Sequence, residues 1–307
     1  MKKLVPFALL AVLSASACSS SNRASSTPES SSSIDPLANK AQVVVMLGQS
    51  NMEGHTHSQY LLDTMGQEKM KEYVDGYDNV QISYACTVSQ NTSNGTFVPV
   101  KLGQGTSATQ FGPEVGMGET LSRADLKYPV FFVKFAQGAT SLHSAWRSPS
   151  SGMNGSLYGL AIEYVSKAMT TLEDMGYYPE IKAICWMQGE DDSTSAYYND
   201  YLDLERAFVS DLRKEFAYYG DPKGIGFVDA AISDSPAWTH RVEINQAKEA
   251  LSKEDDKNVY LDTISAGLKY NAEPPGSPDV YHYDSSSMIK LGNLFAGAVL
   301  NNFLEVR

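Results

Sequence analysis

Three polar stretches of this sequence contain the side-chain types that acyl transfer requires. They are Gly48-Gln49-Ser50-Asn51-Met52, Trp186-Met187-Gln188-Gly189-Glu190-Asp191-Asp192 and Asp279-Val280-Tyr281-His282. Together they supply a hydroxyl, an amide donor, carboxylates and an imidazole. Acyl transfer uses a nucleophile, a base that activates it and donors for the developing oxyanion. Because serine is a weak nucleophile at its own pKa, the serine of the first stretch would need a histidine beside it.

His282 has the sequence surroundings expected of such a base. Asp279 precedes it by three residues, and within one loop that spacing lets the carboxylate reach the imidazole N–H and fix its tautomer. His143 and His240 have no acidic residue three positions before them. His282 is therefore the predicted base and Asp279 its partner.

Other interpretations of these residues remain open at this point. Ser50 could serve as a helix cap, residues 188–190 as an ordinary strand-end turn, and His282 as a surface histidine. His55 and His57 lie so close in sequence to Ser50 that we do not expect them to reach back to it from a rigid strand end. Their His-x-His spacing leaves a metal-binding interpretation open.

Short apolar stretches predict the strands that would position these motifs. They lie at 42–47, 80–85, 128–135, 181–187, 224–229 and 258–262. Most are continuous rather than alternating, as in strands buried on both faces. Helical patterns are found at 156–175, 195–218, 236–253 and 285–304, the third of them opened by Asp234-Ser235-Pro236.

This alternation of strands and helices predicts an α/β fold: a three-layer α/β/α sandwich with a mostly parallel central sheet. Functional loops of such sheets gather at the carboxyl ends of the strands, so we expect the three motifs to meet there. Ser50 does not lie in a Gly-x-Ser-x-Gly motif, because Met52 replaces the second glycine. That departure counts against an α/β-hydrolase nucleophile elbow.

The motifs resemble those of the SGNH hydrolase superfamily, in its branch of sialate O-acetylesterase-like proteins and family 6 carbohydrate esterases. The matching blocks stand in the family's order: Gly48-Gln49-Ser50-Asn51-Met52, Trp186-x-Gln188-Gly189-Glu190-x-Asp192 and Asp279-x-x-His282. Phe111-Gly112-Pro113-Glu114, opening a helix, also matches the branch. The resemblance spans most of the chain beyond residue 37, and it implies a flavodoxin-like form of the predicted sandwich.

The resemblance implies a role for each matched residue. Ser50 would be the nucleophile, His282 the general base and Asp279 the acid that orients it. The oxyanion hole would combine the backbone N–H groups of Ser50 and Gly138 with the side-chain amide of Gln188.

Further residues would support this site. Gln49 and Asn51 flank the serine, and Glu190 would be either a structural partner for nearby loops or a second acid near the histidine, with the structural role favoured. The branch often has a second glycine after Gly138, where this chain has Ala139, so the local loop geometry is expected to differ.

The resemblance implies a serine esterase that removes O-acetyl groups from carbohydrate, such as acetylated xylan or sialic acid, through an acyl-enzyme. No metal or organic cofactor is needed for this chemistry. A lipase or thioesterase on the same scaffold is the alternative enzyme, although the chain shows no long apolar lid. A non-catalytic glycan-binding domain is the alternative outside enzymes, and the intact Ser50, Gln188 and His282 weigh against it. The sequence does not indicate an oligomeric state.

The chain is expected to consist of three parts. Residues 1–17 have the layout of a bacterial signal peptide, and Cys18 directly after Ala17 resembles the lipidated first residue of a lipoprotein. Residues 18–37 are rich in serine and predict a tether, and 38–307 predict one esterase domain. We therefore expect an exported protein, either a lipoprotein of an outer or cell-surface membrane or a periplasmic or secreted protein.

The net charge limits the kinds of molecule that we expect to bind, and the cysteines bear on a possible disulfide. The net charge is −12, and once Lys2 and Lys3 are removed with residues 1–17, 22 basic and 36 acidic side chains leave −14. Such an acidic surface disfavours binding to nucleic acid. It slightly favours neutral polysaccharide over anionic sialic acid as the substrate. Cys185 is interpreted as a small buried residue, although a disulfide with Cys86 is possible in an oxidising compartment.

Overall fold

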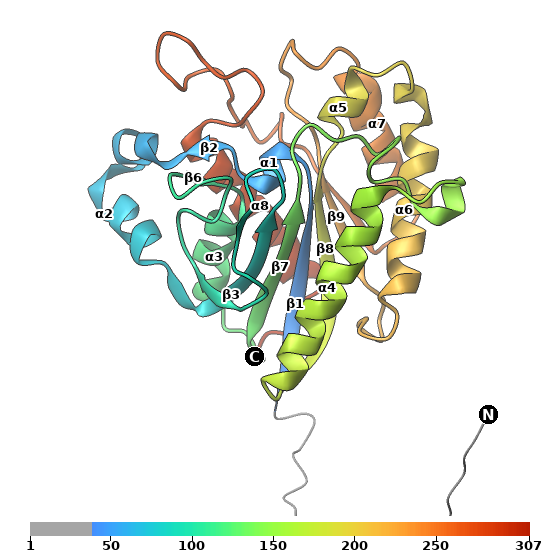
Figure 1. The fold of residues 1–307 in the computed structure, drawn as a ribbon. Helices are drawn as coiled ribbons and strands as arrows, with labels where there is room; N and C mark the ends of the chain where they lie inside the picture. The colour runs from blue at the N-terminus through green and yellow to red at the C-terminus, as the bar shows by residue number, and fades with distance from the viewer. Residues whose placement is uncertain (1–38) are drawn as a thin grey trace, which may run out of the picture. The chain divides into compact units, whose positions relative to one another are not determined.

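The computed structural model describes residues 39–307, which are built around one eight-stranded sheet (Figure 1). Its strands lie in the order β10-β9-β8-β1-β7-β3-β4, and β5 pairs with β3. The strands are β1 (Lys40–Gly48), β3 (Tyr77–Cys86), β4 (Asn91–Thr92), β5 (Val98–Val100), β7 (Val130–Ala136), β8 (Tyr178–Met187), β9 (Gly226–Ala230) and β10 (Asn258–Leu261). Only β4 and β5 run antiparallel to their neighbour within this sheet. A separate two-stranded sheet joins β2 (Thr56–His57) to β6 (Gln110–Phe111).

Helices cover both faces of the sheet. They are α1 (Ser50–Glu53), α2 (Leu61–Asp75), α3 (Glu114–Ser122), α4 (Ser156–Asp174), α5 (Glu190–Ser193), α6 (Tyr201–Glu215), α7 (Arg241–Ser252) and α8 (Ser285–Asn302), with short 3₁₀ turns at Ser58–Tyr60, Pro149–Ser151 and Tyr198–Asp200. Figure 1 shows α4 across one face, where it packs on β7 and β8, and α8 behind the sheet with α3 beside it. The predicted three-layer sandwich with a mostly parallel sheet is confirmed.

The central strands form where the apolar stretches predicted them. Every residue of β1 after Lys40 is buried, and so is all of β7. A strand with no exposed face cannot alternate apolar and polar residues, which explains the continuous pattern in the sequence. Gln42 of β1 and Lys134 of β7 are the exceptions, and Lys134 has a buried acidic partner in Glu114.

Two helices begin later than the sequence pattern predicted. The pattern at 195–218 corresponds to α6, which starts at Tyr201, and the pattern at 236–253 corresponds to α7, which starts at Arg241. The helix start predicted at 234–236 is wrong: the Ser235 Oγ accepts the Ala237 N–H (3.2 Å) and its hydroxyl donates to Val280 O (2.7 Å), but the chain makes only a turn there and α7 begins at Arg241. The Trp238 N–H donates to Ser235 O (3.1 Å), a turn that buries the indole.

Four parallel strands end at the same level of the sheet. In the register, Cys86 of β3 lies beside Ala136 of β7, Ala136 beside Gly48 of β1, and Gly48 beside Met187 of β8. A Cβ on Gly48 would lie 2.1 Å from Met187 O, so only glycine allows this close approach. The segments that follow these strands are therefore neighbours in space.

Three predicted features belong to the first 37 residues. The signal peptide at 1–17, Cys18 and the tether to residue 37 lie outside the described residues.

Cys86 and Cys185 are both buried and form no disulfide, so the possible pairing is absent from this structure. Burial raises the pKa of both thiols, that of Cys86 to about 12. Within residues 39–307, no helix has the length and apolar character needed to span a membrane.

Candidate active site

Ser50 is the first residue of α1, which follows the end of β1 after a single intervening residue. That residue, Gln49, is bonded at both ends: its N–H donates to Met187 O (2.9 Å), and its carbonyl accepts the N–H groups of Met52 (2.8 Å) and Glu53 (2.7 Å). The Ser50 N–H donates to no acceptor within residues 39–307. The serine is thus fixed at the strand end with an unused backbone donor.

One cavity of about 390 Å³ is lined by the predicted nucleophile, one predicted oxyanion-hole residue and the predicted base. Ser50, Gly138 and His282 all line it, although they are far apart in the sequence. The other lining residues are Gln49, His55, Val88, Ala139, Asp191, Trp238 and Tyr281. The cavity lies where the parallel strands end, which is where ligand sites of such sheets are found.

His282 and Asp279 form a close pair in the loop before α8. The His282 Nδ1 lies 2.6 Å from the Asp279 Oδ2, and the Asp279 Oδ1 accepts the Tyr281 N–H (2.9 Å). Burial alone would raise the pKa of Asp279, but the hydrogen bond and charge of His282 outweigh it and lower that pKa. Because Nδ1 is engaged, Nε2 is the ring nitrogen left for Ser50. Within the described residues no hydrogen bond joins Ser50 to His282, and such bonds often tighten only when substrate binds.

Asn51 links the serine helix to the histidine loop. Its Oδ1 accepts the Tyr283 N–H (3.2 Å), and its Nδ2 lies 3.4 Å from Tyr281 O, so it contacts both neighbours of His282. Its Nδ2 also donates to the Glu190 Oε1 at 2.8 Å. Asn51 therefore sets the distance between the first and third motifs.

Glu190 lies behind Asn51 and is fully buried. Burial raises the pKa of its carboxyl group, and its Oε2 has no hydrogen-bond partner among residues 39–307. Its side chain contacts Asn51 and makes no hydrogen bond to His282. These contacts are those of a structural partner for the loops, and the role of Glu190 stays a prediction.

Gln188 does not line the cavity, contrary to the role implied by the resemblance. Its Nε2 donates to Thr140 O (2.9 Å) and to the Asp192 Oδ2 (2.6 Å), and its Oε1 accepts the Tyr201 hydroxyl (2.9 Å). Both of its N–H hydrogens already have acceptors inside the protein. In this structure Gln188 therefore offers no donor to an oxyanion, and it anchors the loop after β7 instead.

Asp192 anchors the same loop and was not predicted to do so. Its carboxylate accepts the N–H groups of Leu142 (2.8 Å) and His143 (3.0 Å) as well as the Gln188 amide. A buried carboxylate with three donors fixes the backbone that it contacts. The last residue of the second motif thus holds the loop that begins at Gly138.

Gly138 lies so close to Ser50 that a larger residue would be tightly packed there. A Cβ built on it would lie 3.3 Å from the Ser50 Cβ and 3.1 Å from both the Glu53 Oε2 and the His55 Nε2. Its N–H donates to the Glu53 Oε2 at 2.7 Å, so this predicted oxyanion donor also has an internal acceptor. The next residue, Ala139, has a φ of 55°, a left-handed conformation that favours glycine.

His55 lines the cavity, so the prediction that it could not return to Ser50 was wrong. The reason is that α1 is only one turn long and ends at Gly54, whose φ of 98° reverses the chain. The His55 ring stacks on the His282 ring, with centroids 4.7 Å apart and planes 16° apart. Within residues 39–307 there is no group of three or more possible metal ligands, so the His55-x-His57 pair belongs to none.

A buried ion pair contacts the C-terminal end of α1. The Lys134 Nζ lies 2.9 Å from the Glu114 Oε2, and both side chains are 0% exposed. The same ammonium donates to Glu53 O (3.2 Å) and Gln104 O (2.7 Å). The last residue of the matched 111–114 block thus helps to hold the end of the serine helix.

Comparisons with known proteins identify the family and the fold. The family described as "Carbohydrate esterase, sialic acid-specific acetylesterase" matches residues 40–301, whereas no curated protein sequence matches the chain. A solved structure of a protein from Arabidopsis thaliana superposes with a TM-score of 0.59 at 17% identity, covering 85% of this chain and 98% of that one. NanS superposes with a TM-score of 0.57 at 14% identity, covering 87% and 98%.

A third structure is a carbohydrate acetylesterase from Xanthomonas citri, with a TM-score of 0.57 at 15% identity, covering 85% of this chain and 56% of that one. At these identities the solved structures show a shared fold. The family match covers nearly all of the described residues, and it includes the serine and histidine that line the cavity. This chain therefore belongs to the carbohydrate esterase family of sialic acid-specific acetylesterases and is a carboxylic ester hydrolase.

Proposed function

We propose that this enzyme removes O-acetyl groups from carbohydrate through an acyl-enzyme on Ser50. The observation that carries this proposal is the cavity that Ser50 shares with His282, whose Nδ1 is held by Asp279. His282 Nε2 takes the Ser50 proton as the Oγ attacks the acetyl carbonyl, and Asp279 stabilises the resulting imidazolium. Collapse of the tetrahedral intermediate expels the sugar oxygen, which takes the proton from His282. Water, activated by the same imidazole, then releases acetate and restores the serine.

The Ser50 N–H is the proposed oxyanion donor. It belongs to the residue whose Oγ attacks the carbonyl, so it is near the developing oxyanion, and it has no acceptor within residues 39–307. One such donor is worth ~10²–10³ in rate. Gly138 and Gln188, whose amide hydrogens have internal acceptors in the free enzyme, contribute here by holding the loop against the serine.

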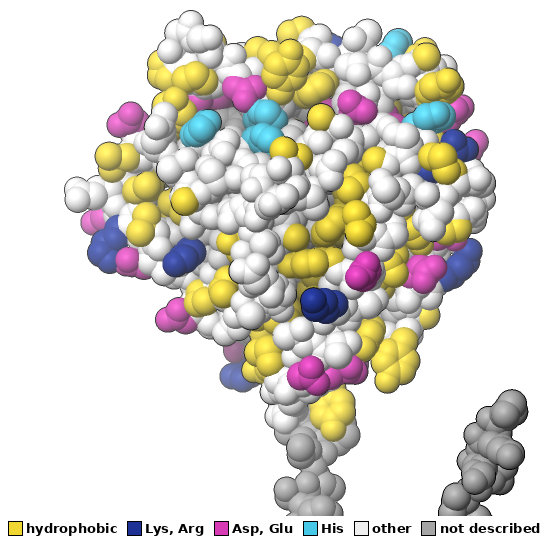
Figure 2. All heavy atoms as spheres, in the orientation of Figure 1, with side chains coloured by type: hydrophobic (Ala, Val, Ile, Leu, Met, Phe, Trp, Pro, Cys, Tyr) yellow, Lys and Arg dark blue, Asp and Glu magenta, His cyan; other side chains and the backbone are white. Residues whose placement is uncertain are grey.

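The cavity walls favour a neutral sugar ester. Trp238 and Tyr281 line it and pack edge to face, with centroids 5.5 Å apart, and such aromatic faces suit a sugar ring. Among its described lining residues Asp191 is the acidic one, and none is lysine or arginine. Figure 2 shows histidine and acidic side chains along the upper part of the face where the strands end. The acidic side chains on this face would repel an anionic sugar and so disfavour its binding.

Acetate release from a panel of esters tests the proposed function. We expect release from acetylated xylan to be faster than from O-acetylated sialic acid, and turnover of a long-chain acyl ester to be slowest. Faster turnover of the long-chain ester would favour the lipase or thioesterase alternative. Glycan binding without acetate release would favour the non-catalytic alternative.

We also propose export and anchoring, for which the support is the sequence of residues 1–18 alone. A signal peptide would be removed before Cys18, and the lipids on that cysteine would hold the domain at a membrane through the serine-rich tether. Mass spectrometry of the mature N-terminus is expected to find a lipid-modified Cys18. An unmodified residue 18 would contradict anchoring.

A further inference from the structure

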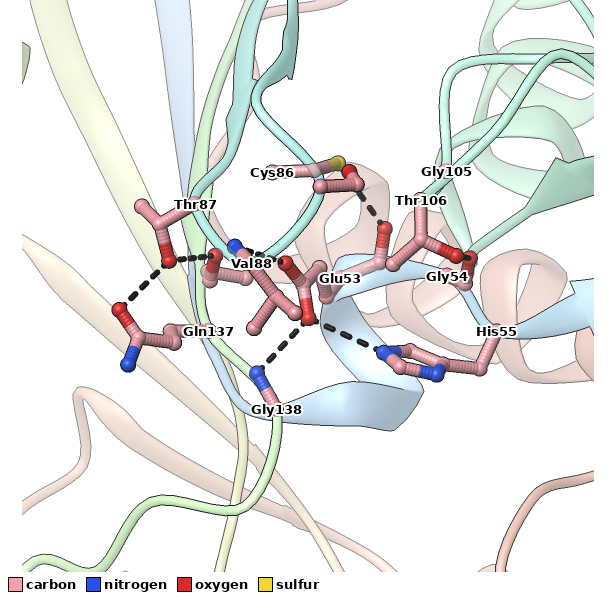
Figure 3. Close-up of polar contacts among 12 residues, drawn as sticks. Glu53, Gly54, His55, Cys86, Thr87, Val88, Gly105, Thr106, Gln137 and Gly138 are labelled. Atoms are coloured by element: carbon pink, nitrogen blue, oxygen red, sulfur yellow. Dashed lines mark hydrogen bonds and ion pairs between the residues drawn. The ribbon is translucent and has the colours of Figure 1, made fainter.

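Glu53 is a fully buried carboxylate for which the proposed reaction has no use. It accepts three hydrogen bonds, from the Gly138 N–H (2.7 Å), the Val88 N–H (3.2 Å) and the His55 Nε2 (3.0 Å) (Figure 3). These donors belong to three different segments, and all three residues line the cavity with Ser50. One side chain thus connects three walls of the active site.

The position of Glu53 is itself tightly fixed. It is the last residue of α1, three residues after Ser50, and its carbonyl accepts from the Lys134 Nζ (3.2 Å) and the Cys86 Sγ (3.3 Å). A buried carboxylate is costly unless hydrogen bonds satisfy it, and three donors do so here. Its geometry is therefore set by the same helix that carries the serine.

The contact with His55 extends this order to the proposed base. His55 is held at Nε2 by Glu53, and its ring lies parallel to that of His282, with centroids 4.7 Å apart. His282 is thereby held at its edge by Asp279 and on one ring face by His55. Rotation of the His282 ring would break one of these two contacts.

We propose that Glu53 is a positioning residue of the active site, an inference that rests on the proposed function. Its carboxylate fixes Gly138 against one side of Ser50 and, through His55, fixes the ring of His282 on the other. Gly138 approaches the Ser50 Cβ so closely that a Cβ would lie 3.3 Å from it. A shift of either wall would change the attack geometry, and a misplacement of about 1 Å can cost ~10²-fold in rate.

The test uses p-nitrophenyl acetate with variants at Glu53 and His55. Glu53→Ala is expected to lower kcat by ~10²-fold with less than about a threefold change in KM, since Glu53 is buried away from substrate. Glu53→Gln keeps one acceptor oxygen and is expected to recover part of that loss. His55→Phe keeps the stacked ring and is expected to retain more activity than His55→Ala.

Glu119→Gln is the matched control. Glu119 is also a buried glutamate with three donors, from Lys69, Tyr73 and Arg123, but it lies on α3 and does not line the cavity. The kcat of Glu119→Gln is expected to stay within about twofold of the wild type at matched folded fraction. A Glu53→Gln kcat no lower than that of Glu119→Gln would overturn the positioning role. A kcat above the wild type would overturn it as well, since the carboxylate would then be withholding the Gly138 amide from substrate.

A fluorophosphonate separates failure of this inference from failure of the proposed function. It reacts with an activated serine by losing fluoride, and mass spectrometry locates the adduct. We expect labelling at Ser50 in the wild type and slower labelling in both Glu53 variants. A wild type that neither labels at Ser50 nor hydrolyses the ester would contradict the proposed function itself. If Glu53→Ala does not fold, Glu53→Gln at matched folded fraction decides the positioning role.

Discussion

Replacing Ser50 by alanine is expected to lower kcat for hydrolysis of a small acetyl ester by ~10⁴- to 10⁶-fold, because the members of such a catalytic unit act together. The fold is expected to persist. The Ser50 side chain forms no hydrogen bond within residues 39–307, so its loss leaves no buried group unpaired. The measurement is kcat for p-nitrophenyl acetate, with circular dichroism to establish the folded fraction.

Ser58→Ala is the control for this experiment. Ser58 is 9% exposed, close to the 7% of Ser50, but it bonds to Thr109 O and lies outside the cavity lining. Its variant is expected to keep nearly full activity. Activity of Ser50→Ala within a few-fold of the wild type would remove Ser50 as the nucleophile and the acyl-enzyme with it.

The layered fold was predictable because its signals are local. Continuous apolar stretches such as 42–47 and 181–187 mark strands buried on both faces, and the structure places β1 and β8 there as neighbours. Polar residues that directly follow such strands must gather at one edge of a parallel sheet. Ser50 directly follows β1, and His282 lies in the loop just before the last helix, α8. Both side chains line one cavity at the strand ends, as this rule predicts.

The details that the sequence did not predict depend on contacts between distant segments. The Asp234-Ser235-Pro236 pattern has the local chemistry of a helix start, and the Ser235 Oγ does accept the Ala237 N–H. Its hydroxyl also donates to the carbonyl of Val280, 45 residues away, and only a turn forms there. Gln188 has the right residue type for an oxyanion donor, yet Thr140 and Asp192 take both of its hydrogens. Hydrogen-bond partners of this kind are fixed only by tertiary structure.

His55 shows the same limit at short range. His55 follows Ser50 by only five residues, so we did not expect it to reach back to the serine from a rigid strand end. The left-handed Gly54 reverses the chain within one residue and brings His55 to the same cavity. The glycine directly after the Gly48–Glu53 segment was the available signal. Glu53 had no signal of its own, because its three donors come from separate loops.

Comparing Asp279→Asn with Glu190→Gln separates the two acids near the histidine. Asp279 contacts the His282 Nδ1 directly (2.6 Å), whereas Glu190 reaches the histidine loop only through Asn51 (2.8 Å). An asparagine at 279 favours the wrong imidazole tautomer, so kcat is expected to fall by up to ~10⁴-fold while substrate binding is kept. The measurement is kcat and KM for a small acetyl ester at matched folded fraction.

Glu190→Gln serves as the counterpart to that variant, because it also exchanges one carboxylate oxygen for an amide. The glutamine oxygen can still accept from Asn51, so the loop of His282 keeps its link to α1. We expect the kcat loss to stay below about tenfold and the main change to be a lower unfolding midpoint. A larger kcat loss for Glu190→Gln than for Asp279→Asn would reverse the two roles, since the acid that orients the imidazole is the one whose amide places the proton on the wrong nitrogen.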